Sequence, residues 1–510
     1  MNNNQRQCRK WCERQQKKIA LRLDEVRRNP ISVGNGPEFG TKKIHYEVSE
    51  RTQAITCGGI GAIHQLVHKV GLVKAIDEGL PILKRHRPYR ESDHILNIAY
   101  NILSGGKVLD DIEVRRNDEA FLDAINARAI PDPTTSGDFL RRLNSNQIKQ
   151  LMTILNEKRV WVWQQQPPSF FNETARVDAD STIVDTKGEH KVGMDFAYNG
   201  VWGYHPLLIT LANTKEPLFI VNRSGNRPSA EGAAEYLDES IKLLRRAGFK
   251  DILLRGDTAF SDTKNFDRWD DDGVRFIFGY RASKYMIEEA EAVDGEMYQL
   301  LIRQAEFALN QRAKQPDVKE AIVRLREYKN CRLEKEEIAE FEFQPGAAKR
   351  PYRVVVLAKT IMEEKGQLTI GFHTKYFFYV TNDRNLTMQQ VIEEANDRCD
   401  QENIIGENKS GTRALTAPLN TLEANWAYMV IASLAWSLKA WFALMLPVNP
   451  RQKAQHLADR KRVLRMEFRS FLQRIILVPA QIIKTGRRLV YRLLAWRPDL
   501  PILFRFLDAL

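Results

Sequence analysis

The sequence predicts an α/β fold in which a mixed β-sheet is flanked by helices, and three observations support this. The chain up to about residue 165 has helical hydrophobic periodicity, and residues 177–222 contain short β-rich runs separated by Gly, Asn and Lys. A long charged stretch then separates these runs from a late apolar helix. Together they indicate a sheet-based core, a helical region before it and an inserted α+β subdomain.

We expect five segments along the chain, with a linker at Gln164 to Pro168. They are a helical N-terminal region (1–165), the first part of the core (170–283), an insertion subdomain (284–386), the second part of the core with a late helix (387–446), and a basic C-terminal region (447–510).

The N-terminal region reads as short helices. Ser92 can cap a helix with an apolar stripe that ends at Gly105 and Gly106, and the Pro- and Thr-rich stretch at 131–136 reads as a turn into the next helix. Arg141 and Arg142 then point outward. These helices suit a DNA-binding module of helix-turn-helix kind, and they suit a small helical bundle equally well.

The core is predicted from a series of strands and one helix. We expect a helix at Ser229 to Ala247, with Ser229 as its N-cap and Gly248 as its stop. The expected strands are Val177 to Thr186, Lys191 to Tyr198, Pro206 to Ala212, Leu218 to Asn222, Asp251 to Arg255 and Val274 to Gly279. An antiparallel meander, a helix and two further strands make the ribonuclease H arrangement, in which the first strand and the end of the fourth core strand bring acids together.

The inserted segment begins with a charged helical stretch from Lys284 through Arg326. It ends with β-like runs at Tyr352 to Ala358 and Tyr376 to Thr381. After it, Trp426 to Leu446 is the most apolar stretch, but it contains Ser433, Ser437 and Lys439. We therefore expect a buried helix here and not a membrane span.

Charge and cysteine content restrict partner and compartment. The net charge is +12 and the pI is about 9.3, which implies a polyanionic partner. Arg451 to Arg492 contains 12 basic and 2 acidic residues, and Met1 to Arg28 contains 9 basic and 3 acidic ones. The five scattered cysteines and the lack of an apolar N-terminal stretch predict a reducing, cytoplasmic setting.

Three acids stand in settings that suit a shared metal site. Asp180 lies in the first core strand, Asp257 follows the strand Asp251 to Arg255, and Glu402 lies in a late helix. If the fold brings them together, carboxylates of this kind hold two divalent cations for phosphodiester chemistry. Asp178 projects to the same strand face as Asp180 and stays open as the alternative acid.

Two cations accompany Glu402. At 100° per residue, Arg398 and Lys409 fall within about 40° of Glu402 on an α-helix. The helix would thus present a metal-binding acid between two phosphate-binding cations. The alternative is a solvated face with scattered charges.

Four motifs together resemble a known family. They are Val-Asp-Ala-Asp-Ser-Thr at 177–182, Gly-Tyr-His-Pro-Leu-Leu at 203–208, Arg-Gly-Asp-Thr-Ala-Phe at 255–260, and Arg-x3-Glu-x6-Lys from Arg398. Their order and spacing resemble the DDE transposases of bacterial insertion sequences, in the branch with a Tyr-x2-Arg-x3-Glu-x6-Lys signature, closest to insertion-sequence family thirteen-eighty. The position of the signature Tyr holds Ala395.

The resemblance implies catalytic acids at Asp180, Asp257 and Glu402, with Mg²⁺ as the cofactor and Mn²⁺ as an alternative. It also implies binding of terminal inverted repeats, strand cleavage at the element's ends and transfer of 3′ hydroxyls into target DNA. Such enzymes generally act as dimers or larger assemblies on paired DNA ends, here in a bacterial cytoplasm at the nucleoid.

Further DNA contacts are predicted at two places. Tyr204 and His205, with Trp202, either stack on unpaired bases near the cut or fill the core. A basic amphipathic helix is expected to offer cations to phosphates, with a membrane-surface helix as the alternative. Its cations are Arg460, Lys461, Arg462, Arg465 and Arg469.

Two other functions compete with transposition. A nuclease of the same fold that cuts without joining uses the same metals, and a DNA-binding protein that lost its chemistry would keep the basic surfaces. The intact set of three acids argues against the second of these.

Overall fold

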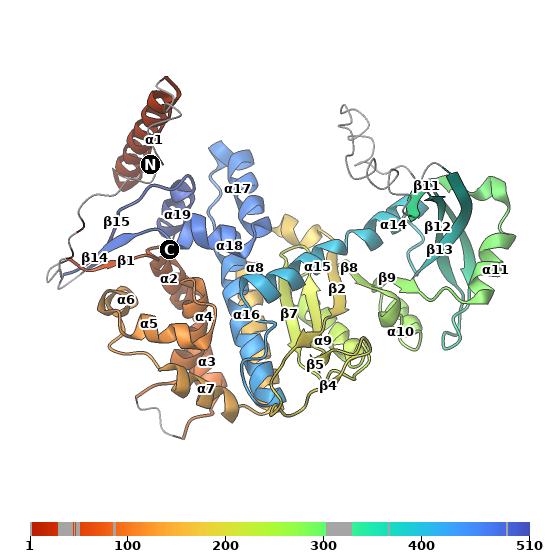
Figure 1. Ribbon diagram of the computed structural model, residues 1–510, viewed down its shortest axis with the longest axis horizontal. Coiled ribbons are helices and arrows are strands. Elements are labelled where there is room, and N and C mark those ends of the chain that lie inside the picture. Colours follow the sequence, from red (N-terminus) through yellow and green to blue (C-terminus); the bar gives the residue numbers. More distant parts are fainter. Residues whose placement is uncertain are drawn as a thin grey trace.

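The structure is a computed structural model, and it describes residues 3–28, 44, 46, 52–84, 88–301, 329–365, 368–485 and 488–509. The molecule is elongated: helices of the N-terminal and C-terminal regions lie at one end, and three long strands lie at the other (Figure 1).

Five strands form one end of a large nine-stranded sheet. They are β2 (Ala175–Ser181), β6 (Leu207–Leu211), β7 (Glu216–Val221), β8 (Ile252–Gly256) and β9 (Arg275–Tyr280). Their order is β7-β6-β2-β8-β9, in which β6 is antiparallel to its neighbours and β8 is parallel to both β2 and β9. Helices α9 (Ala233–Ala247) and α10 (Phe266–Asp271) provide the crossovers. The predicted mixed sheet flanked by helices is confirmed.

The expected meander is wrong in one part. The first strand ends at Ser181, and the short strands β3 (Val184–Asp185), β4 (Asp195–Phe196) and β5 (Trp202–Tyr204) form a separate sheet of order β3-β5-β4. Pro206 lies between β5 and β6, and because proline has no N–H to donate, it interrupts the ladder there.

Helix α9 begins at Ala233, four residues after the predicted cap Ser229. The reason lies in Arg223, whose guanidinium donates to the carbonyls of Pro228, Ser229 and Glu231. These carbonyls therefore bind a side chain instead of starting a helix. The predicted stop is correct, because Gly248 has φ +119°.

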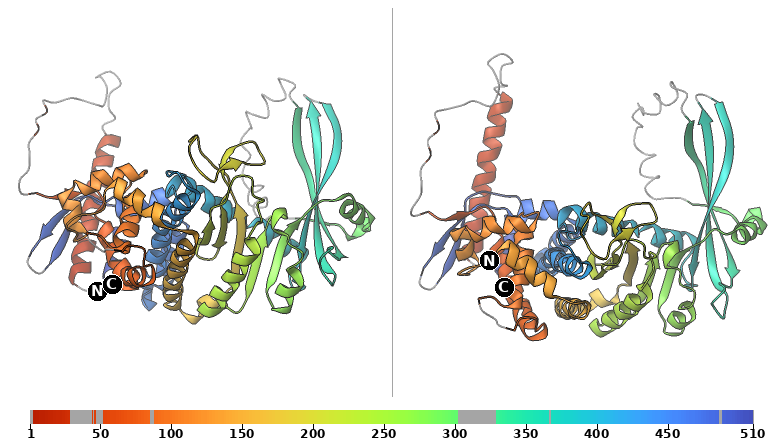
Figure 2. Two further views of the ribbon diagram at one scale, coloured as in Figure 1. Left: turned by 90° about the horizontal axis from the view of Figure 1, so that it is seen from below. Right: turned by 60° about the horizontal axis from the view of Figure 1, so that its bottom comes forward.

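The inserted segment extends the core sheet. It comprises α11 (Lys284–Ala292), β10 (Gln299–Leu300), β11 (Lys329–Phe343), β12 (Tyr352–Lys365) and β13 (Leu368–Thr381). Strand β13 pairs with β9 at only four positions, and the rest of β11–β13 projects beyond the core (Figure 2). The expected helical stretch through Arg326 ends at Ala292, and the prediction is wrong for 293–301, which contain a short turn and β10. Residues 302–326 of that prediction lie outside the described residues.

The helices before the core pack together around one buried helix. They are α2 (Ile60–Val70), α3 (Leu72–Gly79), α4 (Glu91–Leu103), α5 (Ile112–Arg116), α6 (Glu119–Ala124), α7 (Pro133–Arg142) and α8 (Ser145–Gln164). Helix α4 is almost wholly buried and packs on α16 (Leu422–Leu444), which favours the bundle over a free-standing helix-turn-helix module.

Two predicted caps in this region are corrected. Helix α4 is capped at Arg90, whose N–H donates to Asp93, so Ser92 lies inside the helix. The stretch read as a turn forms the first turn of α7, because Asp132 caps it and Pro133 occupies the first helical position.

Helix α16 confirms the prediction of a buried apolar helix. It is long and apolar enough to cross a membrane, but all of its apolar window is buried inside the fold. Trp441 and Trp163 of α8 donate to the buried carboxylate of Glu216 on β7, and Arg159 of α8 pairs with it. The three elements are thereby tied together around one buried charge.

The two ends of the described chain meet. Helix α1 (Asn3–Arg28) contacts α19 (Leu500–Leu507), and β1 (Ala54–Ile55) pairs with β14 (Ala480–Lys484), which pairs in turn with β15 (Leu489–Leu493). Between the core and this small sheet lie α17 (Lys453–Arg465) and α18 (Phe468–Phe471).

Candidate active site

Asp180 lies at the carboxyl end of β2, where the strand leaves the sheet. Its Oδ1 accepts from the Ser181 amide at 2.7 Å, and its Oδ2 lies 3.9 Å from Nη1 of Arg398. Burial raises the pKa of Asp180 to about 6; the Ser181 amide and Arg398 oppose the shift, and the charges of Asp257 and Glu402 add to it. Asp257 and Glu402 therefore both act on Asp180 electrostatically.

Asp257 reaches the same sheet edge from the neighbouring strand. Because β2 and β8 are parallel and Ala179 is in register with Gly256, the residues that follow them, Asp180 and Asp257, lie at neighbouring positions at the carboxyl ends of the two strands. The Oδ1 of Asp257 accepts from the Ala259 amide at 2.8 Å, which caps a short 3-10 turn.

Glu402 comes from the helices that cover this edge, α14 (Met388–Asn396) and α15 (Cys399–Gly406). Its side chain is exposed and lines the same cavity as Asp257. The helix is tied to the sheet on either side: Nε2 of Gln401 donates to the Asp178 carbonyl at 3.2 Å, and Asp400 pairs with Lys215 at 2.8 Å.

The predicted helix face of Arg398, Glu402 and Lys409 is not a single α-helix. Arg398 precedes α15, and after Gly406 the chain widens into a π-helical turn, Glu407–Gly411. Angles of 100° per residue therefore do not apply. Both cations still reach the site: desolvation lowers the pKa of Lys409, while the charges of Asp185 and Asp180 oppose that shift.

Asp178, the alternative acid, is held in a buried charge network. Its two oxygens accept from Nε and Nη2 of Arg255 at 2.6 and 2.9 Å, and both side chains are buried. Arg255 also donates to the carboxylate of Glu394 on α14 at 3.0 Å, and Arg176 of β2 forms a two-pronged ion pair with the same carboxylate. We call Asp178, Arg255, Glu394 and Arg176 the buried charge network. Because Arg255 occupies both oxygens of Asp178, the network favours Asp180 as the metal-binding acid.

Two of the three aromatic residues predicted near the cut are buried in the core. Tyr204 is fully buried and donates to the Val192 carbonyl, and His205 is buried with Nε2 2.9 Å from Ser181 Oγ. Stacking on bases needs an accessible ring face. The core alternative therefore fits Tyr204 and His205, while Trp202 is exposed.

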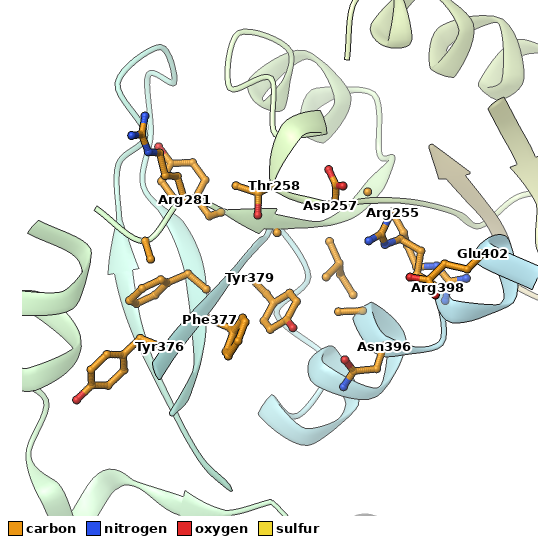
Figure 3. Close-up of a pocket in the computed structure, with 17 residues that line it drawn as sticks. Arg255, Asp257, Thr258, Arg281, Tyr376, Phe377, Tyr379, Asn396, Arg398 and Glu402 are labelled. Carbon is orange, nitrogen blue, oxygen red and sulfur yellow. The ribbon is translucent and has the colours of Figure 1, made fainter. Parts of the chain in front are cut away.

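A cavity of about 480 Å³ opens from the acids toward the inserted strands. Asp257, Arg398 and Glu402 lie toward one end of it, and Arg281, Tyr376 and Phe377 lie toward the other (Figure 3). Sequence reasoning missed the second group, because the run at 376–381 was read only as strand. Its signal was the four consecutive aromatic residues at 376–379. Ala395, at the position of the signature Tyr, also lines this cavity.

The predicted C-terminal cations divide into two kinds. Arg460 is directed inward, where it donates to Gln166 Oε1 and the Leu446 carbonyl at 2.7 Å each, and Arg462 pairs with Asp499 at 2.6 Å. Lys461, Arg465 and Arg469 are exposed. The expected single helix is divided, since α17 ends at Arg465 and Phe468 begins α18.

The chemistry of the site suits a divalent cation. Its three donors are carboxylates, which Mg²⁺ prefers, and their mutual repulsion is what a cation between them relieves. Within the described part of the chain, however, no three acidic, His or Cys side chains lie close enough together to enclose a metal ion. The three carboxylates are therefore the right type of ligand for the ion, but in this structure they lie too far apart to bind one ion together.

Comparisons with known proteins show the family to which the chain belongs. No curated protein matches it. Among solved structures, it is similar to the cryo-EM structure of a piggyBac transposase synaptic complex with hairpin DNA, with a TM-score of 0.34 and 10% identity over 82% of this chain and 81% of that one. The sequence profile of the family "Transposase DDE domain group 1" matches residues 42–510, nearly the whole chain. The chain belongs to this family of DDE transposases.

Proposed function

We propose that this transposase serves a bacterial insertion sequence of the Tyr-Arg-Glu-Lys branch, closest to family thirteen-eighty. It binds the terminal inverted repeats, cuts the strands at the element's ends and transfers the 3′ hydroxyls into target DNA. The observation that carries the proposal is geometric: Asp180 and Asp257 follow paired residues of the parallel strands β2 and β8, and Glu402 lines the same cavity as Asp257.

Asp180, Asp257 and Glu402 would hold the metal, Mg²⁺ or alternatively Mn²⁺. Bound there, two such ions activate the attacking oxygen and stabilise the leaving one. Because the carboxylates are spaced openly, binding requires them to approach one another.

The cations beside the acids and the adjoining cavity bind the DNA strand. Arg398 and Lys409 lie beside Asp180 and can bind the phosphate that flanks the cut. The cavity gives the strand a path from the acids toward Arg281 on the far side. We further propose that the protein acts as a dimer or larger assembly on paired ends, in the cytoplasm at the nucleoid.

The test replaces each acid separately, as Asp180→Asn, Asp257→Asn and Glu402→Gln, and measures cleavage of DNA that carries the element's own ends. Each change should lower cleavage about a thousandfold, because metal-based charge stabilisation is worth several kcal/mol and each 1.4 kcal/mol is tenfold. Binding of the ends in a gel-shift assay should persist.

Glu393→Gln is the matched control, because Glu393 is an exposed acid on the adjacent α14. It should leave cleavage unchanged. Normal cleavage by any one acid variant would remove that residue from the site. Cleavage without joining to a target plasmid would identify a nuclease in place of a transposase.

A further inference from the structure

The small sheet beside the acids presents three aromatic rings to solvent. Phe196, Tyr198 and Trp202 are 60%, 86% and 36% exposed. The rings of Phe196 and Trp202 are cross-strand neighbours in edge contact, with centroids 4.7 Å apart. Aromatic rings usually supply core packing, so a group of three on one short hairpin calls for a ligand.

The hairpin that carries these rings is rigidly built. Its tip is a tight turn in which Ala197 and Val201 bond and Gly200 has φ +78°. At its base, a Cβ on Gly203 would lie 2.2 Å from the Val184 carbonyl oxygen, and one on Gly225 would lie 2.2 Å from the Asp195 carbonyl oxygen. Such close backbone packing fixes the hairpin, so its rings are presented without rearrangement.

The hairpin is also linked to the acid site. The Tyr198 ring centroid lies 6.4 Å from that of His205, and Nε2 of His205 lies 2.9 Å from Ser181 Oγ. Ser181 directly follows Asp180. A strand whose phosphate lies at Asp180 therefore has its adjacent nucleotides within reach of Tyr198.

We propose that Phe196, Tyr198 and Trp202 form a stacking platform for unpaired bases of the DNA strand next to the phosphate bound by Arg398 and Lys409 beside Asp180, an inference that rests on the proposed function. Every base has a ring face, so such stacking is independent of sequence. Three rings are far fewer than a stable protein interface of about 800 Å² per partner requires. The chain carries a net charge of +12, which favours a polyanion as the ligand of these rings.

The experiment compares two DNA probes: a duplex with a short gap of unpaired thymines, and the same duplex with the gap filled. The full-length protein should bind the gapped probe more tightly. In the double variant Phe196→Ala, Tyr198→Ala, this preference should fall about tenfold, because one stacked base is worth about 1–3 kcal/mol. Binding of the filled duplex should not change.

Two controls separate stacking from folding. Tyr198→Phe keeps the ring face and should retain the preference, and Tyr285→Ala removes a 54% exposed tyrosine from the distant α11. A second readout is 2-aminopurine placed in the gap, whose fluorescence should be quenched by the wild-type protein and should recover in the double variant.

An unchanged preference in the double variant, or an equal loss on both probes, would overturn the platform. Failure of the proposed function has a different signature, because it would appear as a wild-type protein that does not cut its own ends. The gap assay needs no cleavage, and Asp180→Asn should leave the gap preference intact.

Discussion

The buried charge network and the acid site are neighbours on β2, and each contains an aspartate of that strand. The aspartate of the network is neutralised by an arginine, whereas the aspartate of the acid site is not. Asp178 meets a bidentate arginine and is fully buried, whereas Asp180, two residues later, has Arg398 only at 3.9 Å and faces two further acids. In the network two acids balance two arginines. At the acid site three carboxylates outnumber the cations that reach them.

The difference indicates which acids are structural and which are functional. A paired, buried carboxylate stabilises the fold through its partner, and removing either partner leaves a buried charge unpaired. A cluster of carboxylates whose mutual repulsion is not balanced by cations lowers the stability of the free protein. Such clusters are typical of functional sites, where a bound cation removes the repulsion. Replacing an acid of the network should therefore lower the free energy of unfolding, whereas replacing Asp180 should raise it.

The largest effect is expected from Asp178→Asn. It leaves the buried guanidinium of Arg255 without its bidentate partner, and we expect the free energy of unfolding to fall by about 3–5 kcal/mol. Urea unfolding at neutral pH measures it. A decrease below about 1 kcal/mol would mean that the network does not stabilise the core.

Asp180→Asn should have the opposite sign. Its pKa of about 6 in the folded protein exceeds the ordinary value of 3.8, so ionisation opposes folding. The contribution of Asp180 to stability is therefore most favourable below pH 4 and is lost as the pH rises to about 6. At pH 8 without divalent cations, the variant should be more stable by up to about 3 kcal/mol, since each pKa unit is 1.36 kcal/mol.

The matched measurement is the same pair of proteins at about pH 3.5, where Asp180 is largely protonated in both states and the difference should nearly vanish. Adding Mg²⁺ at pH 8 should stabilise the wild-type protein more than the variant. Equal stability of the two proteins at all pH values would show that burial and neighbouring charges do not disfavour ionised Asp180.

Glu394→Gln tests the outer part of the network. Desolvation favours a higher pKa for Glu394, but its bonds to Arg176 and the charge of Arg255 lower it below its usual range. Without these charge-assisted bonds, the free energy of unfolding should decrease by about 2 kcal/mol. Glu393→Gln, one residue away and exposed, should change it by less than about 0.5 kcal/mol.

The smallest effects concern the C-terminal cations. Replacing exposed Lys461, Arg465 and Arg469 by Ala should flatten the dependence of log K on log salt by about 0.9 for each DNA phosphate that these cations neutralise. Arg460→Ala should leave that slope unchanged, because Arg460 bonds inward to Gln166. An equal slope in both variants would place the DNA elsewhere.

Much of the core could be predicted from local pattern. The apolar and β-branched runs placed β6, β8 and β9 to within one residue at each end, and Gly248 placed the end of α9, because strand propensity and glycine geometry are local properties. The start of α9 could not be predicted, since Arg223 captures the carbonyls that would have begun it.

The remaining differences arise from contacts between distant segments. The insertion was expected as a separate subdomain, but β13 pairs with β9 and continues the same sheet. Of the aromatic residues, Tyr204 and His205 are buried, whereas Phe196 and Tyr198 near the hairpin tip are exposed. The positions of these residues in the sequence do not distinguish the buried rings from the exposed ones.

By itself, the sequence determined which residue types were available and in which local element each acid lies, because helix and strand periodicity depend on near neighbours. Only the tertiary structure decided that Asp178 is neutralised by Arg255 while Asp180 faces Asp257 and Glu402. The register of two parallel strands and the docking of α14 and α15 on their edge set which charges meet. The interaction between two charges depends on their distance and burial, and neither can be read from their separation along the chain.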